Sequence, residues 1–88
     1  MLNKELRESI ATINENAVLF DNPEFDNSII GMTFDGNVVY NYEKMVEELM
    51  HDDSISEEEA IEFIDYNTLR VIPYINIGDK PIVMLEGI

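Results

Sequence analysis

The stretch of sequence that decides the fold runs from residue 28 to residue 40 and reads SIIGMTFDGNVVY. Its two ends are rich in β-branched and aromatic residues, which favour strands, and the pair Asp35-Gly36 lies between them. Asp-Gly is typical of a tight hairpin turn, because both positions tolerate positive φ at low cost. We therefore predict strands over 28–34 and 37–40. Alternation along the first strand places three apolar side chains on one face, which we expect to be the core face: Ile30, Met32 and Phe34.

Two helices are predicted after the hairpin. Asn41 is suited to cap a helix over residues 42–51, because its side chain can accept a backbone N–H of the first turn. Apolar residues with helical spacing follow Asn41, and the polar run 52–54 ends the pattern. Ser56 and Glu59 have the spacing of a capping box that begins a second helix. The expected buried residues of these helices are Tyr42, Met45, Val46, Leu49, Met50, Ala60, Ile61 and Ile64, with Phe63 as a further candidate.

The flanking segments complete the predicted fold. Residues 2–15 have the apolar spacing of an amphipathic helix, residues 18–20 suit an edge strand or a packed loop, and residues 82–85 suit a final strand. Asn67 is expected to end the second helix of the pair in a left-handed conformation. Residues 69–77 are ambiguous because Pro73 disfavours a central strand. We predict an α+β fold in one domain, residues 1–88, with a small antiparallel sheet (hairpin 28–40 plus a C-terminal strand) covered by an N-terminal helix and a two-helix hairpin.

Composition limits the classes of function. The 88 residues contain 19 acidic and five basic side chains, giving a formal net charge of −14. Such a charge repels nucleic acids and anionic membranes and attracts basic surfaces, so we expect no direct nucleic-acid or membrane partner. The chain has no cysteine, no signal-peptide pattern and no apolar run long enough for a membrane helix, which favours a cytoplasmic location. Nothing in it matches a cofactor motif or a nucleophile constellation, so we predict no cofactor and no enzymatic activity.

Three segments together resemble a known group of proteins: FDNSIIG at 25–31, DGNVVY at 35–40 and EAIEFIDYNTLR at 59–70. The group consists of short uncharacterised acidic proteins of Gram-positive bacteria and their phages and other mobile elements. The resemblance extends over roughly residues 18–85 and implies no catalytic residue and no activity. It implies a genomic context, because small proteins of this kind often travel on phages, where inhibitors of host defence are common.

The strongest candidate site is an acidic band between residues 43 and 65, in which ten of 23 residues are acidic and Lys44 is the only lysine or arginine. Several of these residues form like-charged i,i+4 pairs, each of which costs about 0.2–0.5 kcal/mol on an isolated helix. One interpretation is mimicry of the phosphate charge of DNA; the other is an ordinary solvated helix face. The residues that we predict to bind a partner are Glu47, Glu48, Asp52, Asp53, Glu58 and Glu62.

Two clusters could hold a metal ion. Residues 21–27 contain five oxygen-bearing side chains, but Pro23 and the lack of a central glycine break the EF-hand pattern. His51-Asp52-Asp53 is a second, weaker cluster. For both we favour loop capping and solvation and predict no metal site.

A last candidate is an aromatic and basic patch near the C-terminus. Tyr and Arg are common at binding hot spots, so a recognition patch could form from Tyr66, Asn67, Arg70, Pro73 and Tyr74. The alternative that we favour pairs Arg70 with Asp65 or Glu62 and places the two tyrosines over the edge of the core.

Two functions follow from these observations. The first is a phage-type inhibitor that occupies a basic nucleic-acid-binding surface on a host defence protein, such as an anti-CRISPR or anti-restriction protein. The second is a regulatory interaction module, such as an antitoxin, adaptor or homodimer, that uses an exposed strand edge or the apolar side of the N-terminal helix. In both cases the partner is a protein.

Overall fold

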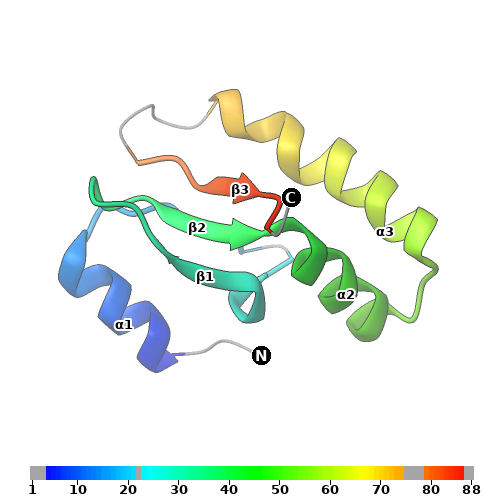
Figure 1. The fold of residues 1–88 in the computed structure, drawn as a ribbon, viewed down its shortest axis with the longest axis horizontal. Helices are drawn as coiled ribbons and strands as arrows, with labels where there is room; N and C mark the ends of the chain where they lie inside the picture. Colours follow the sequence, from blue (N-terminus) through cyan, green and yellow to red (C-terminus); the bar gives the residue numbers. More distant parts are fainter. Residues whose placement is uncertain (1–3, 22, 75–78, 87–88) are drawn as a thin grey trace.

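The computed structural model describes residues 4–21, 23–74 and 79–86, and it confirms the α+β class (Figure 1). Short 3-10 turns flank the longer elements, and a π-helical turn extends α3. In chain order the elements are α1 (Lys4–Ile13), η1 (Asp26–Ser28), β1 (Ile29–Met32), β2 (Val38–Asn41), α2 (Tyr42–Asp53), α3 (Glu57–Phe63), η2 (Ile64–Thr68), η3 (Leu69–Tyr74) and β3 (Ile82–Met84).

The sheet has the strand order β1-β2-β3. β1 and β2 form the predicted antiparallel hairpin, but β3 pairs with β2 in parallel, with Tyr40 opposite Val83. The expectation of an antiparallel sheet was therefore wrong for its third strand. The reason lies in the connection, because α2, α3 and the turns after them carry the chain back to the same end of the sheet before β3 begins.

The predicted core face of β1 was wrong because the strand contains a β-bulge. Ile29 pairs with Tyr40 and Gly31 with Val39, so one extra residue lies between Ile29 and Gly31 on this strand. An extra residue reverses the alternation of side chains beyond it. Ile29 and Met32 consequently both pack against the core. Phe34, which we had placed in the core, lies in the hairpin turn and is fully exposed.

The hairpin turn also differs from the two-residue turn that Asp35-Gly36 predicted. Thr33 N–H donates to Asn37 O at 2.8 Å and Gly36 N–H donates to Thr33 O at 2.9 Å, which closes a three-residue loop. Gly36 has φ of +91°, whereas Asp35 is not among the described residues with positive φ. A side chain at Gly36 would also crowd Asn14, whose amide donates to Gly36 O at 3.0 Å and joins the end of α1 to the turn.

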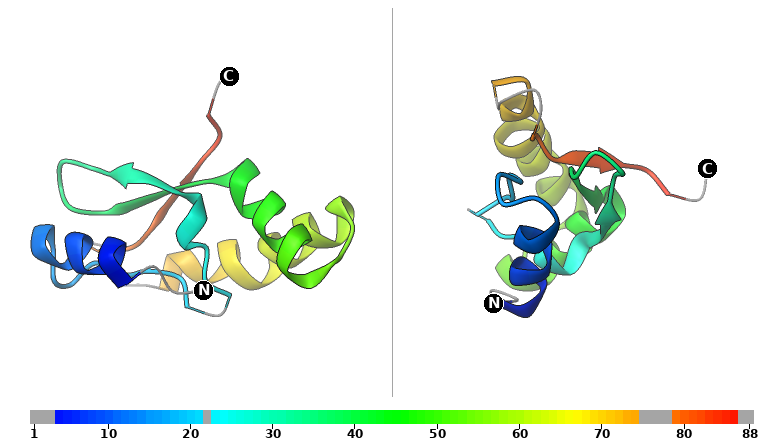
Figure 2. Two further views of the ribbon diagram at one scale, coloured as in Figure 1. Left: turned by 90° about the horizontal axis from the view of Figure 1, so that it is seen from below. Right: turned by 90° about the vertical axis from the view of Figure 1, so that its left-hand side faces the viewer.

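The core lies on one side of the sheet. Figure 2 shows α1, the loop after it and α3 together on that side. Residues 18–20 belong to this loop and form no strand, which settles the alternative left open by the sequence. The ring of Phe20 packs 4.7 Å from that of buried Tyr40, whose hydroxyl accepts the Phe20 N–H at 3.0 Å. Burial raises the pKa of Tyr40 to about 12.

The helix caps agree with the predicted ones. The Asn41 side chain accepts the Lys44 N–H at 2.9 Å at the start of α2, and Ser56 and Glu59 form a capping box at the start of α3. The predicted end at Asn67 was wrong. Asn67 lies inside η2 and is not among the described residues with positive φ. The helical path continues to Tyr74 because Leu69 and Ile72 pack against the core. The rest of the ambiguous segment 69–77, from residue 75 onward, falls outside the described residues.

Candidate functional site

The acidic side of α2 gathers half of the predicted binding residues around one hollow. Asp52 follows Glu48 by four positions, which places these two on the same side of the helix, and Glu47 is the neighbour of Glu48 in sequence. The opposite side is buried through Met45 and Leu49. Together with Asn27, Lys44 and His51, the three carboxylates line an open depression of about 340 Å³. These three carboxylates of α2 therefore border one hollow.

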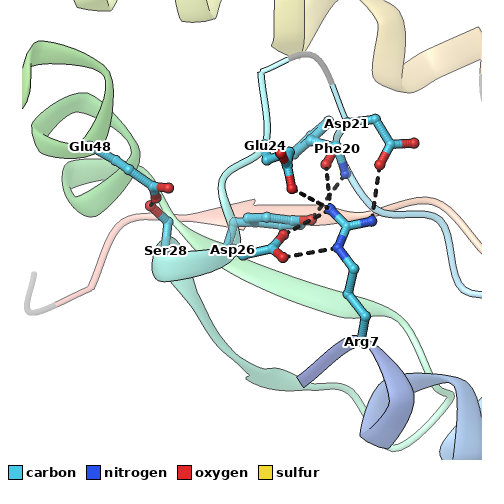
Figure 3. Close-up of polar contacts among 8 residues, drawn as sticks. Arg7, Phe20, Asp21, Glu24, Asp26, Ser28 and Glu48 are labelled. Atoms are coloured by element: carbon cyan, nitrogen blue, oxygen red, sulfur yellow. Dashed lines mark hydrogen bonds and ion pairs between the residues drawn. The ribbon is translucent and has the colours of Figure 1, made fainter. Parts of the chain in front are cut away.

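Glu48 is the best-anchored carboxylate of this group. The Ser28 hydroxyl donates to Glu48 Oε1 at 2.7 Å, which fixes the side chain against η1 (Figure 3). Burial raises the pKa of Glu48 above its ordinary value, the hydrogen bonds from Ser28 and the Asn27 backbone oppose the rise, and nearby Asp52 and Asp26 add to it. Glu48 is therefore a negative charge held in place at some electrostatic cost.

The other predicted residues divide between two further places. Asp53 joins Glu48, Asp52 and Glu24 around a smaller hollow of about 130 Å³ between α2 and the loop before η1. Glu62, on α3, lines a separate depression with Glu59 and Tyr66, and Glu58 lines none of these hollows. The structure thus brings Glu47, Glu48, Asp52 and Asp53 together and leaves Glu58 and Glu62 as a second group.

The acidic groups on α2 and α3 have few cationic partners. The ion pairs between described residues involve Arg7 or His51. His51 Nδ1 lies 3.2 Å from Asp52 Oδ1 on an exposed ring, and Lys44 makes no ion pair with any described carboxylate, although it lines the same hollow as Glu47. Most of the negative charge of the two helices therefore faces solvent without compensation from the described part of the chain.

The carboxylates of the loop from Asp21 to Asp26 surround an arginine (Figure 3). Arg7 reaches from α1, and its Nε and Nη2 donate to the two carboxylate oxygens of Asp26 at 2.9 Å. Nη1 donates to Asp21 at 2.9 Å, and Glu24 lies 3.8 Å from Nη2. The Asp26 carboxylate is only 1 % exposed, so this is a nearly buried charge with a bidentate partner.

This arginine cluster revises our interpretation of the oxygen-rich loop. We had favoured solvation and capping for these side chains, whereas Asp26 is buried and the loop carboxylates converge on Arg7. Asn22 lies outside the described residues. Across the described ranges no group of three or more histidines and carboxylates is arranged to hold a metal ion. The sequence signal was available, because Arg7 is the lone arginine of the N-terminal half, but its partners are distant in sequence.

The aromatic and basic patch also differs from the favoured alternative. The Arg70 guanidinium lies over the Tyr66 ring, 4.3 Å from its centroid, and makes no ion pair with Asp65 or Glu62. Tyr66 is 59 % exposed and Tyr74 is 90 % exposed, so neither covers the core edge. The side chains that we expected to close the core are thus surface groups.

Comparisons with known proteins add no family or relative: no protein-family model, no curated protein and no solved structure matches the chain. Within the described ranges, none of the helices is both long enough and apolar enough to cross a membrane.

Proposed function

We propose that this protein is a non-enzymatic inhibitor of the phage type, which acts in the cytoplasm by occupying a basic nucleic-acid-binding surface on a host defence protein. A CRISPR effector or a restriction enzyme is the kind of partner that fits. The observation that carries the proposal is the group of carboxylates on α2, of which Glu47, Glu48 and Asp52 line one hollow without a lysine or arginine paired to them. A cleft built to bind phosphates attracts such a surface.

Two features of the group suit it to this role. The Ser28 hydroxyl holds Glu48 in place, so little side-chain freedom is lost when a partner binds. Burial is the main cause of the raised pKa of Glu48, and the nearby charges of Asp52 and Asp26 add a smaller repulsion to it. A cationic partner would relieve that repulsion, which favours the bound state.

The test is binding to a guide-loaded CRISPR nuclease or a restriction enzyme, measured by fluorescence anisotropy at increasing NaCl concentration. We expect log Kd to rise steadily with log salt, because charged contacts are screened. The variant Glu47→Lys/Asp52→Lys should weaken binding about 100-fold, since each reversed contact costs on the order of tenfold.

The matched control is Glu8→Lys/Glu15→Lys, which makes the same change in net charge at exposed positions in and just after α1. It should alter Kd by no more than about threefold through the long-range field alone. Equal losses in the two double variants, or binding that ignores salt, would contradict a specific acidic surface on α2.

A regulatory interaction module, such as an antitoxin or adaptor, is the second candidate, and the apolar surface at β3 favours it. Met84, the last residue of β3, and Leu85, which follows it, are 39 % and 52 % exposed. The apolar side of α1 offers less, because Ile10 is buried and Leu6 packs against the core, which leaves Ile13 exposed. Light scattering separates the two candidates: a tight dimer that dissociates on a Leu85→Asp substitution would favour this module over the inhibitor.

A further inference from the structure

An apolar groove lies between β3 and the helical turns that follow α3. Its lining comes from Tyr42 at the start of α2, Leu69 of η3, the last two residues of β3 and the residue after them, and its volume is about 280 Å³. In Figure 1 β3 lies between β2 and the helical segment that runs from α3 to η3. The lining residues are Tyr42, Asp65, Leu69, Val83, Met84 and Leu85.

The strand that forms one wall of this groove has a free edge. β2 pairs with one edge of β3, and no strand among the described residues pairs with the other. An unpaired edge presents backbone N–H and C=O groups to which an extended segment can add as a further strand. The adjoining groove would then receive alternate side chains of that segment, because successive residues of a strand point to opposite faces.

The groove has anionic groups at its border. Asp65 contributes to the lining, and Glu86 follows β3 closely, with its Oε1 3.5 Å from the Asn41 amide next to Tyr42. Neither carboxylate makes an ion pair with a described residue. Burial and, after it, the neighbouring charge of Asp65 raise the pKa of the Tyr42 hydroxyl, which marks Asp65 as a negative charge beside the groove. The groove therefore suits an occupant whose apolar side chains contact its walls and whose neighbouring basic side chains meet the two carboxylates at its border.

We propose that this groove binds an extended segment of a partner protein in which apolar residues alternate with arginine or lysine, and that the segment adds to the free edge of β3. A second copy of this chain is the less complementary occupant, because each copy has a net charge of −14 and would bring its own carboxylates to the groove. This site goes beyond the proposed acidic surface and shares no lining residue with the α2 hollow. Failure at one site therefore leaves the other unaffected.

The test uses three synthetic peptides and the ¹⁵N-labelled full chain. The first is Ac-Thr-Val-Arg-Val-Lys-Val-Thr-NH2, the second has Glu in place of Arg and Lys, and the third has Ser in place of Val. We expect the first peptide to shift the amide signals of Leu69 and of Val83 to Leu85. The acidic and serine peptides should bind at least about tenfold more weakly, because the first of them lacks the basic side chains and the second lacks the apolar ones.

Two variants localise the effect, each with a control of the same chemistry elsewhere. Leu85→Asp should weaken binding of the first peptide about tenfold. Ile13→Asp, at a similarly exposed apolar position on α1, should not weaken it. Asp65→Arg should weaken it about fivefold, whereas Glu58→Arg on α3 should not.

Some outcomes would overturn the proposal. They are no amide shift at millimolar peptide, equal shifts with the acidic peptide, or shifts confined to the α2 hollow. Shifts of the groove amides with protein concentration alone would assign the groove to a second copy of the chain and would overturn it as well.

Discussion

At the scale of single residues, Arg7 does the most to position the loop before the sheet. Its guanidinium satisfies both oxygens of Asp26, whose carboxylate is nearly buried. Removing one partner of a buried pair leaves an uncompensated charge, which typically costs more than the pair itself stabilises. Arg7 therefore links α1 to the segment that carries Ser28, and through it to Glu48.

We expect Arg7→Met to lower the free energy of unfolding by about 3 kcal/mol, because Asp26 keeps its burial and loses its bidentate partner. Urea denaturation at pH 7 measures this loss. Lys4→Met, one turn earlier at an exposed position of the same helix, is the matched control and should change stability by no more than about 0.5 kcal/mol. Equal small effects of the two substitutions would show that the arginine cluster does not hold the fold together.

Glu48 gives the stability a pH dependence whose sign follows from its raised pKa. The folded chain holds the proton on Glu48 up to a higher pH than the unfolded chain does. The stability from this group is complete below the ordinary glutamate pKa and declines as pH rises through the interval between the ordinary and the raised value. Glu48→Gln cannot ionise, so its stability relative to the parent should increase as pH rises through that interval.

Chemical denaturation of both proteins at several pH values measures that gain. Glu47→Gln is the control, because it removes an exposed carboxylate from the same side of α2 without the Ser28 contact. Parallel pH profiles for Glu48→Gln and Glu47→Gln would contradict the account of Glu48 as a charge held against its neighbours.

At the scale of elements, the connection between α2 and α3 contains a correctable strain. Ser54, the C-cap of α2, has φ of +53°, in the left-handed region that favours glycine. We expect Ser54→Gly to raise the free energy of unfolding by about 0.5–1 kcal/mol, because glycine adopts this conformation without a steric penalty. Thermal unfolding measures the gain. Ser56→Gly, at the capping box two residues later, should instead destabilise, and a loss from both substitutions would contradict this explanation.

The elements predicted from the sequence are those whose signals are local. The Asn41 cap and the Ser56–Glu59 capping box depend on residues within one helical turn, and both formed as predicted. The end at Asn67 failed because contacts of Leu69 and Ile72 with the core outweighed a local stop signal. The prediction of the core face of β1 was wrong because nothing in the sequence marked the bulge after Ile29.

The same distinction between local signals and distant contacts applies to the candidate site. Helical spacing places Glu48 and Asp52 on one side of α2, but which carboxylates share a hollow could not be told from the sequence. The link from Ser28 to Glu48 and the arginine cluster join residues distant in sequence, so only the tertiary structure reveals them. The same holds for the groove beside β3, which depends on the parallel direction of that strand.

At the scale of the whole molecule, the net charge of −14 opposes the compact state. Ions screen this repulsion, so raising NaCl from about 10 mM to 500 mM should stabilise the fold by about 1 kcal/mol and raise Tm by about 4–8 °C. Differential scanning calorimetry measures the shift. The triple variant Glu57→Gln/Glu58→Gln/Glu62→Gln should respond less, and a Tm that falls with salt in the parent would contradict net repulsion.

The parallel pairing of β3 with β2 has a consequence for how the chain folds. The hairpin joins strands that are neighbours in sequence, whereas β3 meets β2 only after the whole of α2, α3, η2 and η3 has intervened. Closing so long a loop costs conformational entropy before any contact compensates for it. High contact order of this kind slows folding, so β3 should be the last element to dock, leaving an intermediate or transition state in which Tyr40 still lacks its neighbour Val83.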